Sequence, residues 1–197
     1  AANASPRGTT PSAPATSVLL STDMFTLNDE DAIAPIDQFV KTDADKAWLK
    51  GFYPAFMANS QTDGKTWGVP FQRSTVVMYY NKDLFREAGL DPNKAPQSWK
   101  ELSEAAQKLT KKDASGKVTQ YGIQIPSTGF AYWMLQTLTT PNGVLLANET
   151  GTKVTFDHPK VIEALEYWVN LTKQGVHPAG VVEWGTTPKD FFEKKAA

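Results

Sequence analysis

Residues 68–85 of this 197-residue chain read GVPFQRSTVVMYYNKDLF, and they give the clearest structural signal in the sequence. Between residues 74 and 80, β-branched and aromatic side chains follow one another without a Gly or Pro, which predicts a strand. Asn81 then stands where an N-cap is expected, and we predict a helix over residues 82–88 that Gly89 ends. The stretch is therefore expected to be a strand followed directly by a helix.

Helix signals and strand signals alternate along the rest of the chain. Ser98 and Glu101 have the spacing of a capping box, which predicts a helix over residues 99–111. Asp157 is expected to cap a second long helix. The buried face of that helix is expected to be Val161, Leu165, Trp168 and Leu171. Shorter strands are expected at 17–20, 121–125, 144–147 and 153–156, a turn at 63–65, and further helices at 45–57, at 129–138 and from Thr187 to the last residue. This alternation is typical of the α/β class.

The composition excludes several classes of function. Twenty Lys and Arg against 21 Asp and Glu leave a net charge of −1, which offers no bulk attraction to nucleic acid or to an anionic membrane. Cys is absent, so disulfides, thiolate zinc sites and cysteine nucleophiles are excluded. The two histidines, His158 and His177, are expected to face solvent. The sequence contains neither a Gly-x-Ser-x-Gly nucleophile motif nor a glycine-rich phosphate-binding motif. No stretch approaches the ~20 apolar residues that span a bilayer.

Aromatic side chains carry more information, because they make up 11% of the chain and include six Trp. Three of these Trp lie on predicted helices, where packing is the expected role: Trp48, Trp99 and Trp168. The other three lie beside Gly, Pro or Thr at the ends of elements: Trp67, Trp133 and Trp184. Flat rings at the ends of elements are suited to wall a cleft or to stack on a sugar ring.

Charged side chains leave two hypotheses open. Arg73 precedes two hydroxyl side chains at the start of the predicted strand, where a guanidinium could bind a polyol or a phosphate; the alternative is a surface cation. Glu183 beside Trp184, or the acidic run that begins at Asp29, could serve a carbohydrate-active hydrolase. For the acidic run, the competing interpretation is a solvated helix start.

The run from residue 68, continued by Ala88-Gly89-Leu90 and by PQSWKEL at 96–102, resembles the extracellular solute-binding proteins of ATP-driven sugar importers. This is the maltose-binding-like family, and the sequence is most similar to its glycerol-3-phosphate-binding branch. The resemblance covers residues 17–197 and implies an α/β, periplasmic-binding-protein-like fold with two α/β lobes joined by crossing strands. Family members are about twice this length, so only part of the fold is expected. Residues 1–16 would be flexible or irregular, 17–75 part of lobe one, and 76–197 part of lobe two after the hinge crossing.

The resemblance also implies a function. The chain would be a binding protein and not an enzyme, and it would need no cofactor. It would act in the periplasm or elsewhere outside the cytoplasm, and a lipid anchor on the full-length protein is one option. Its ligand would be a carbohydrate, a polyol or a glycerol-3-phosphate-type solute, held between two lobes for import. Its protein partner would be the membrane permease of an ABC transporter, and nucleic acid would not be a partner. The hydrolase remains the alternative function.

Candidate ligand-binding residues follow from the same resemblance. Ser74 matches the ligand-binding serine of the glycerol-3-phosphate branch on the crossing strand. Trp133 matches the second tryptophan of that branch's paired wall, and Phe130 stands at the first position of the pair. Asp23 lies near an acidic ligand-contacting position, and Arg73 replaces a residue that is not usually cationic. Trp184 completes the set of candidates from its place at the end of an element.

Overall fold

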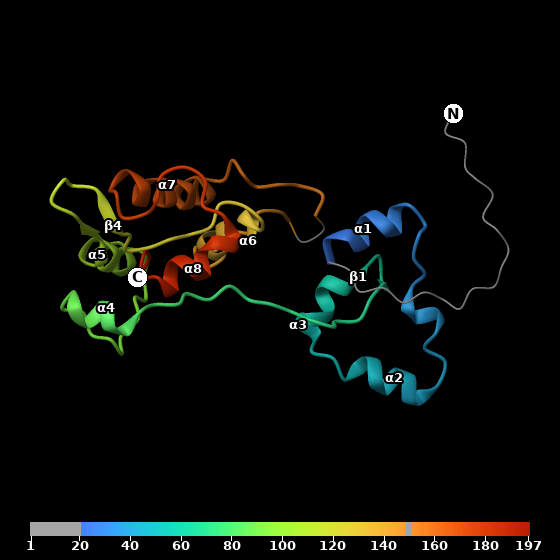
Figure 1. Cartoon of the computed structure of the whole chain (residues 1–197). Coiled ribbons are helices and arrows are strands. Elements are labelled where there is room, and N and C mark those ends of the chain that lie inside the picture. The colour runs from blue at the N-terminus through green and yellow to red at the C-terminus, as the bar shows by residue number, and fades with distance from the viewer. Residues whose placement is uncertain (1–20, 149–150) are drawn as a thin grey trace, which may run out of the picture. The chain divides into compact units, whose positions relative to one another are not determined.

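The computed structural model describes residues 21–148 and 151–197 (Figure 1). The strand expected at 17–20 and the irregular segment expected at 1–16 lie outside the described residues. By its internal contacts the chain divides into two compact units, Ala1–Thr75 (unit 1) and Val76–Ala197 (unit 2).

Unit 1 consists of short helices and one small hairpin. Its helices are α1 (Ser21–Asp29), α2 (Asp43–Lys50) and α3 (Pro54–Met57), with 3-10 turns η1 (Ile36–Gln38) and η2 (Ala58–Ser60). Strands β1 (Gln61–Thr62) and β2 (Lys65–Thr66) pair antiparallel. Asp63 and Gly64 between them both have positive φ, 51° and 70°, which confirms the turn expected there.

The helix expected over 45–57 is two helices, because Pro54 cannot continue α2 and instead begins α3. Thr42 and Asp45 form a complete capping box at the start of α2. Trp48, expected to pack in the core, is 54% exposed, with its ring edge-on to Phe52 at 5.2 Å. The helical spacing was right, but α2 buries none of its residues.

Unit 2 holds the longer helices. These are α4 (Lys82–Glu87), α5 (Trp99–Leu109), α6 (Ala131–Thr139), α7 (Pro159–Lys173) and α8 (Thr187–Phe192), with the 3-10 turn η3 (Trp184–Thr186). Strands β3 (Lys111–Lys112) and β4 (Val118–Gln120) pair antiparallel. The cap expected at Asn81 is confirmed, because its side chain accepts the N–H groups of Asp83 and Leu84.

The Ser98 cap is also confirmed, but the capping box is only half formed. The Ser98 hydroxyl accepts the Glu101 N–H at 3.2 Å. The Glu101 carboxylate accepts the N–H of Gln97 at 2.9 Å, one residue before the N-cap. The start of α5 is therefore satisfied by the two side chains that the sequence indicated.

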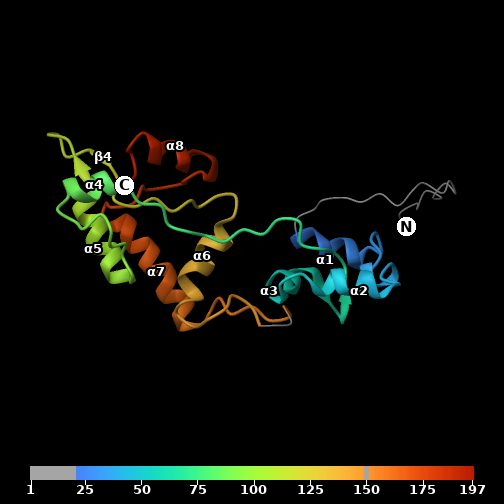
Figure 2. The same ribbon diagram turned by 90° about the horizontal axis from the view of Figure 1, so that it is seen from below.

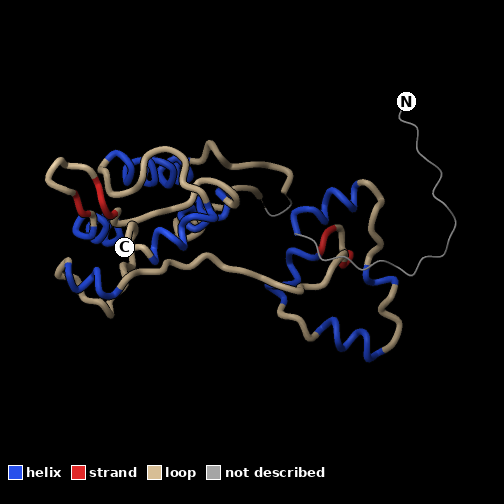
Figure 3. The backbone as a smooth tube through the Cα atoms, viewed as in Figure 1, coloured by secondary structure: helices blue, strands red, loops and turns tan. Residues whose placement is uncertain are grey.

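The strand expected over residues 74–80 is not part of a sheet. The described residues form only two two-stranded pairs, and 74–80 belong to neither (Figure 3). Val77 and Tyr79 are exposed in this segment. The prediction was wrong because β-propensity records how well side chains suit a pleated surface, whereas a strand also needs a hydrogen-bonded neighbour.

The other expected strands are reduced to single bridges. Tyr121 forms a parallel bridge with Ala196, and Ala147 forms an antiparallel bridge with Val154. The last helix, expected to run to the end of the chain, stops at Phe192. Residues 195–197 then return alongside Tyr121, whose N–H donates to Lys195 O at 2.8 Å.

The core of unit 2 lies between its helices. One cluster joins α5 to α7 and consists of Ala106, Ile123, Leu171 and Val176. A second cluster joins α4 to α5 and consists of Leu84, Phe85, Ala105 and Leu109. A third consists of Val144, Leu146 and Val161, with Leu135 of α6 packed against it; α6 and α7 lie side by side in Figure 2.

Helix α7 differs from its prediction at two points. Its N-cap is His158, whose Nδ1 accepts the Lys160 N–H at 3.2 Å, and not Asp157. Val161 and Leu171 are fully buried as expected, but Leu165 is 41% exposed and Ala164 is buried in its place. Ala164 lies three residues after Val161 and seven before Leu171, which keeps it on the inner face.

The revised inner face of α7 leads to a stability prediction. Replacing Leu171 by Ala removes a fully buried side chain, and we expect the free energy of unfolding to fall by about 2–5 kcal/mol. Leu165→Ala is the matched control on the same helix and should cost less than about 1 kcal/mol. Urea denaturation of both variants measures the difference, and equal losses would contradict the assignment of the buried face.

Candidate functional site

The six candidate site residues divide evenly between the units. Asp23 in the first turn of α1, Arg73 and Ser74 belong to unit 1. Phe130, Trp133 and Trp184 belong to unit 2. The two sets are described separately.

The three unit 2 candidates come together as one group of rings. Phe130 stacks on Trp133, with centroids 4.8 Å apart and planes 20° apart. Trp184 meets Phe130 edge-on at 5.4 Å, although it lies 54 positions further along the chain. Tyr132, which the sequence analysis did not select, meets Trp133 edge-on at 5.7 Å. We call these four residues the aromatic corner.

The aromatic corner is only partly covered by the rest of unit 2. Tyr132 is 43% exposed and Trp184 is 38% exposed, and Phe130 and Trp133 are half-buried. Rings in contact with each other and still open to solvent can stack against the apolar face of a small solute. Tyr132 could have been suspected from its place between the two wall positions.

Hydrogen bonds between two distant segments hold the aromatic corner together. Ser127 N–H donates to Val182 O at 2.8 Å, and Val182 N–H donates to Ser127 Oγ at 2.9 Å. Thr128 Oγ1 accepts the backbone N–H of Trp184 at 3.2 Å and donates to Glu183 Oε2 at 2.7 Å. This clamp of residues 127–128 and 182–184 places Trp184 against Phe130.

Gly129 lies between the clamp and α6 and is required there on two grounds. Its φ is +72°, a conformation that costs other residues free energy. A Cβ atom at this position would lie 3.0 Å from Trp184 Cβ. Any side chain would therefore press on the Trp184 side chain.

Arg73 is engaged in unit 1. Its Nη2 donates to Ser60 Oγ at 2.8 Å, and its Nε donates to Phe56 O at 3.2 Å. The two acceptors lie in α3 and η2, so the guanidinium ties the segment after β2 to those helices. Ser74 and Asp23 are exposed.

The histidines are not both exposed as the sequence analysis expected. His158 is exposed and caps α7, but His177 is only 4% exposed. The Ile125 N–H donates to His177 Nε2 at 3.0 Å, which leaves Nδ1 as the N–H that donates to Pro178 O at 2.7 Å. Burial lowers the pKa of the His177 imidazole below its ordinary value. The prediction failed because a residue beside Gly and Pro looked like a surface loop.

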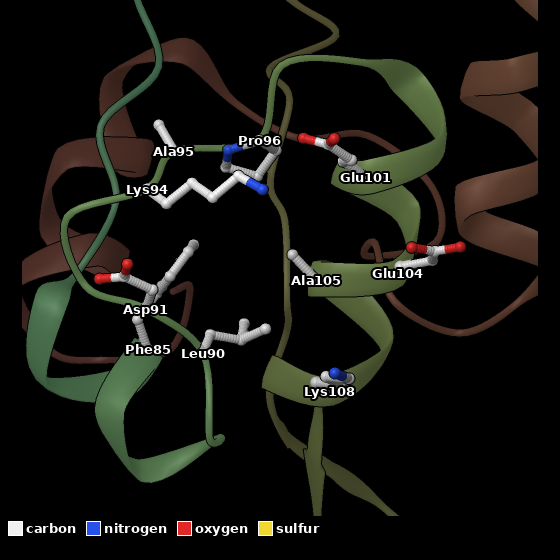
Figure 4. Close-up of a pocket in the computed structure, with 10 residues that line it drawn as sticks. All are labelled: Phe85, Leu90, Asp91, Lys94, Ala95, Pro96, Glu101, Glu104, Ala105 and Lys108. Atoms are coloured by element: carbon white, nitrogen blue, oxygen red, sulfur yellow. The ribbon is translucent and has the colours of Figure 1, made fainter.

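Two hollows occur on unit 2. One, of about 300 Å³, lies between residues 90–96 and α5, where Leu90 and Ala105 point toward each other and Lys94 lies along one side (Figure 4). None of the candidate site residues lines it. The other, of about 280 Å³, is lined by Val182 and Glu183 of the clamp, among other residues. The four rings of the aromatic corner are not among the lining residues of this second hollow, which shares Val182 and Glu183 with the clamp.

The described residues contain no group of three or more acidic, His or Cys side chains that could hold a metal ion. Within the same residues, no helix is long and apolar enough to cross a membrane.

Comparison with known proteins identifies the chain's relatives. Residues 1–197 match the family described as bacterial extracellular solute-binding protein. The chain belongs to this family. The resemblance seen in the sequence is thereby confirmed.

Individual relatives of this solute-binding chain are named for glycerol 3-phosphate. The sn-glycerol-3-phosphate-binding periplasmic protein of Brucella abortus is 32% identical over 155 residues, which is 77% of this chain and 35% of the relative. The protein of that name from Yersinia enterocolitica is 31% identical over 148 residues, 73% of this chain and 33% of the relative. The solute-binding chain thus spans about a third of the length of these curated relatives.

Solved structures confirm the α/β, periplasmic-binding-protein-like fold class. UgpB of Mycobacterium tuberculosis, in complex with glycerophosphocholine, gives a TM-score of 0.71 at 21% identity and covers 88% of this chain and 43% of that one. An ABC substrate-binding protein of Listeria monocytogenes, in complex with cycloalternan, gives 0.59 at 26% identity and covers 88% and 44%. The solute-binding chain therefore has the fold of part of such a protein.

Gly129 provides a test of how the aromatic corner of this solute-binding chain is built. We expect Gly129→Ala to lower the free energy of unfolding by about 1–3 kcal/mol and to shift the Trp emission, because φ strain and contact with Trp184 act together. Gly180→Ala is the matched control, since its φ is +80° but a Cβ there meets nothing within 4 Å. A smaller loss and an unshifted spectrum in the control would separate the two effects. If both variants behave alike, the close approach to Trp184 is not what requires Gly129.

His177 gives the solute-binding chain a predictable pH dependence. Because its pKa is lowered in the folded state, the unfolded chain takes up a proton first as the pH falls below about 6.5. Stability should therefore decrease from pH 6.5 toward pH 5, as measured by urea denaturation at each pH. Carboxylates whose pKa is lowered by hydrogen bonds, such as Asp113 and Glu193, lose their contribution only nearer pH 4.

The control for this pH dependence is the exposed histidine. His177→Gln should flatten the decrease between pH 6.5 and pH 5, and His158→Gln should retain it. A His177→Gln variant with the wild-type slope would refute the assignment.

Proposed function

We propose that this chain forms part of the solute-binding component of an ABC importer. The component captures a carbohydrate, a polyol or a glycerophosphoryl solute between two lobes and delivers it to the membrane permease. One observation carries the proposal: Phe130, Trp133 and Trp184, chosen as candidates from the sequence, form one partly exposed group of rings. Family membership supports it.

In this proposal unit 1 belongs to lobe one and unit 2 to lobe two. The boundary between Thr75 and Val76 supports the assignment, because it falls inside the extended segment 74–80. An extended segment without a sheet partner is suited to cross from one lobe to the other. Binding would then close the lobes, stabilised by contacts that the solute makes to both at once.

Each candidate residue has a distinct role in this scheme. Trp133 and Phe130 stack on the solute, and Trp184 borders the stacking surface. The Ser74 hydroxyl and the Asp23 carboxylate, both exposed, form hydrogen bonds with solute hydroxyls. Arg73 is already bonded to Phe56 and Ser60, so its part is to position the adjacent Ser74.

The family and its named relatives are binding proteins, which weighs against a hydrolase. The alternative would use Glu183 or the acids near Asp29. Glu183 accepts a hydrogen bond from Thr128 and belongs to the clamp, which gives it a structural and binding role without any hydrolysis. Release of product from an aryl glycoside, lost in Glu183→Gln, would establish the hydrolase.

An extracellular family places the site of action outside the cytoplasm. The relatives named for glycerol 3-phosphate are periplasmic proteins, which supports the same compartment for this chain. We propose that it meets its solute there.

Isothermal titration of the full-length protein tests the proposal. The probes are glycerol 3-phosphate, glycerophosphocholine and mannobiose, and at least one should bind. Trp133→Ala should weaken that binding by roughly three- to tenfold, because one stacking contact is worth about 0.5–1.5 kcal/mol. Trp48→Ala, which truncates an exposed Trp of unit 1, is the control and should leave the affinity unchanged. No heat with any probe would overturn the ligand class.

A further inference from the structure

Glu183 occupies a particular position beside the aromatic corner. It is exposed and immediately precedes Trp184, whose ring borders Phe130. Only its Oε2 is held, by the Thr128 hydroxyl at 2.7 Å. The same Thr128 oxygen accepts the backbone N–H of Trp184 at 3.2 Å, so a single hydroxyl holds both the Glu183 carboxylate and the backbone of Trp184. The side chain is thus positioned with acceptor capacity remaining.

The surroundings of Glu183 do not neutralise it. Among the ion pairs formed by residues 21–148 and 151–197, none includes Glu183. Lys195 and Glu183 both line the hollow of about 280 Å³ described above. The Lys195 Nζ, however, lies 2.7 Å from a Glu193 carboxylate oxygen. Asp190 adds a second carboxylate to the lining. The faces of aromatic rings also carry partial negative charge. Within the described residues, Glu183 therefore keeps a negative charge without a cationic partner, directly before Trp184 in the chain.

We infer that Glu183, positioned by Thr128, is a specificity-determining residue that disfavours anionic solutes at the aromatic corner and accepts hydrogen bonds from solute hydroxyls. This inference rests on the proposed function. It separates the chain from relatives named for glycerol 3-phosphate, because a phosphate monoester placed against the rings would meet an unpaired carboxylate. Arg73, the cation expected from the sequence to bind a polyol or a phosphate, donates hydrogen bonds to Phe56 and Ser60 of unit 1.

The expected size of the effect follows from simple electrostatics. Two unit charges about 6 Å apart in a largely aqueous site interact by about 1 kcal/mol. That energy corresponds to a change in affinity of roughly three- to tenfold. Salt screens an exposed charge, so the effect should shrink at high ionic strength.

A measurement without any ligand tests the charge directly. Quenching of Trp fluorescence in the full-length protein is recorded with iodide, caesium and acrylamide, and the Trp184 contribution is the part lost in Trp184→Phe. In Glu183→Gln we expect the ratio of iodide to caesium quenching of this part to rise about twofold or more, with acrylamide quenching unchanged. Glu166→Gln, which removes an exposed carboxylate of α7, is the matched control and should leave the ratio unchanged. An unchanged ratio in Glu183→Gln overturns the inference.

Thr128 is tested as a positioning residue by a pair of variants. Thr128→Ser keeps the hydroxyl and should retain the wild-type quenching ratio. Thr128→Val removes the hydroxyl and should shift the ratio toward that of Glu183→Gln. A Thr128→Val variant with the wild-type ratio would show that Glu183 is positioned without Thr128.

Titration then connects the charge with selectivity. In Glu183→Gln, glycerol 3-phosphate should bind roughly three- to tenfold more tightly, and mannobiose should not. The inference is overturned if Glu183→Gln binds both solutes more tightly than the wild-type protein does. It is also overturned if at least one solute binds and the variant tightens the binding of neither. If neither binds the wild-type protein or the variant, the proposed function fails on its own, and the quenching ratio still decides the role of Glu183.

Discussion

The clamp between residues 127–128 and 182–184 is the constraint on which the candidate site depends. The Thr128 hydroxyl both accepts the backbone N–H of Trp184 and donates to the Glu183 carboxylate, so one side chain holds the backbone of Trp184 and the charge beside it. Gly129 follows directly and leaves room for the Trp184 side chain. Helix α6 begins two residues later and carries Trp133, which completes the stack. Without this contact between segments, Trp184 would separate from the stack of Phe130 and Trp133, whose rings lie three positions apart along the chain.

Local features of the fold could be predicted from the sequence, because they depend on residues close along the chain. Asn81 and Ser98 cap α4 and α5 as expected, since a side chain that accepts from N–H groups two or three positions away needs no distant partner. The turn at Asp63 and Gly64 follows from the same kind of local preference. The family resemblance supplied the global fold, which no local signal contained.

Features that depend on distant contacts could not be predicted in the same way. Segment 74–80 has strand composition but no strand beside it in the described residues. Leu165 fits the helical spacing but lies outside the buried face, and His177 is buried by Ile125, 52 positions away. For the site, the resemblance selected Phe130 and Trp133, whereas Tyr132 and Thr128 were identified from the contacts. Arg73 was selected for its charge, and its hydrogen bonds to Phe56 and Ser60 in unit 1 became evident only from the structure.

The separation of the two clamp segments sets when the aromatic corner can exist. Thr128 and Glu183 lie 55 positions apart, with α6 and α7 between them. Contacts of such sequence separation form only after the intervening loop has closed, which is a slow step compared with helix formation. A chain emerging from the ribosome thus has its helices before Trp184 reaches Phe130. Completion of the aromatic corner then coincides with completion of the tertiary structure of unit 2.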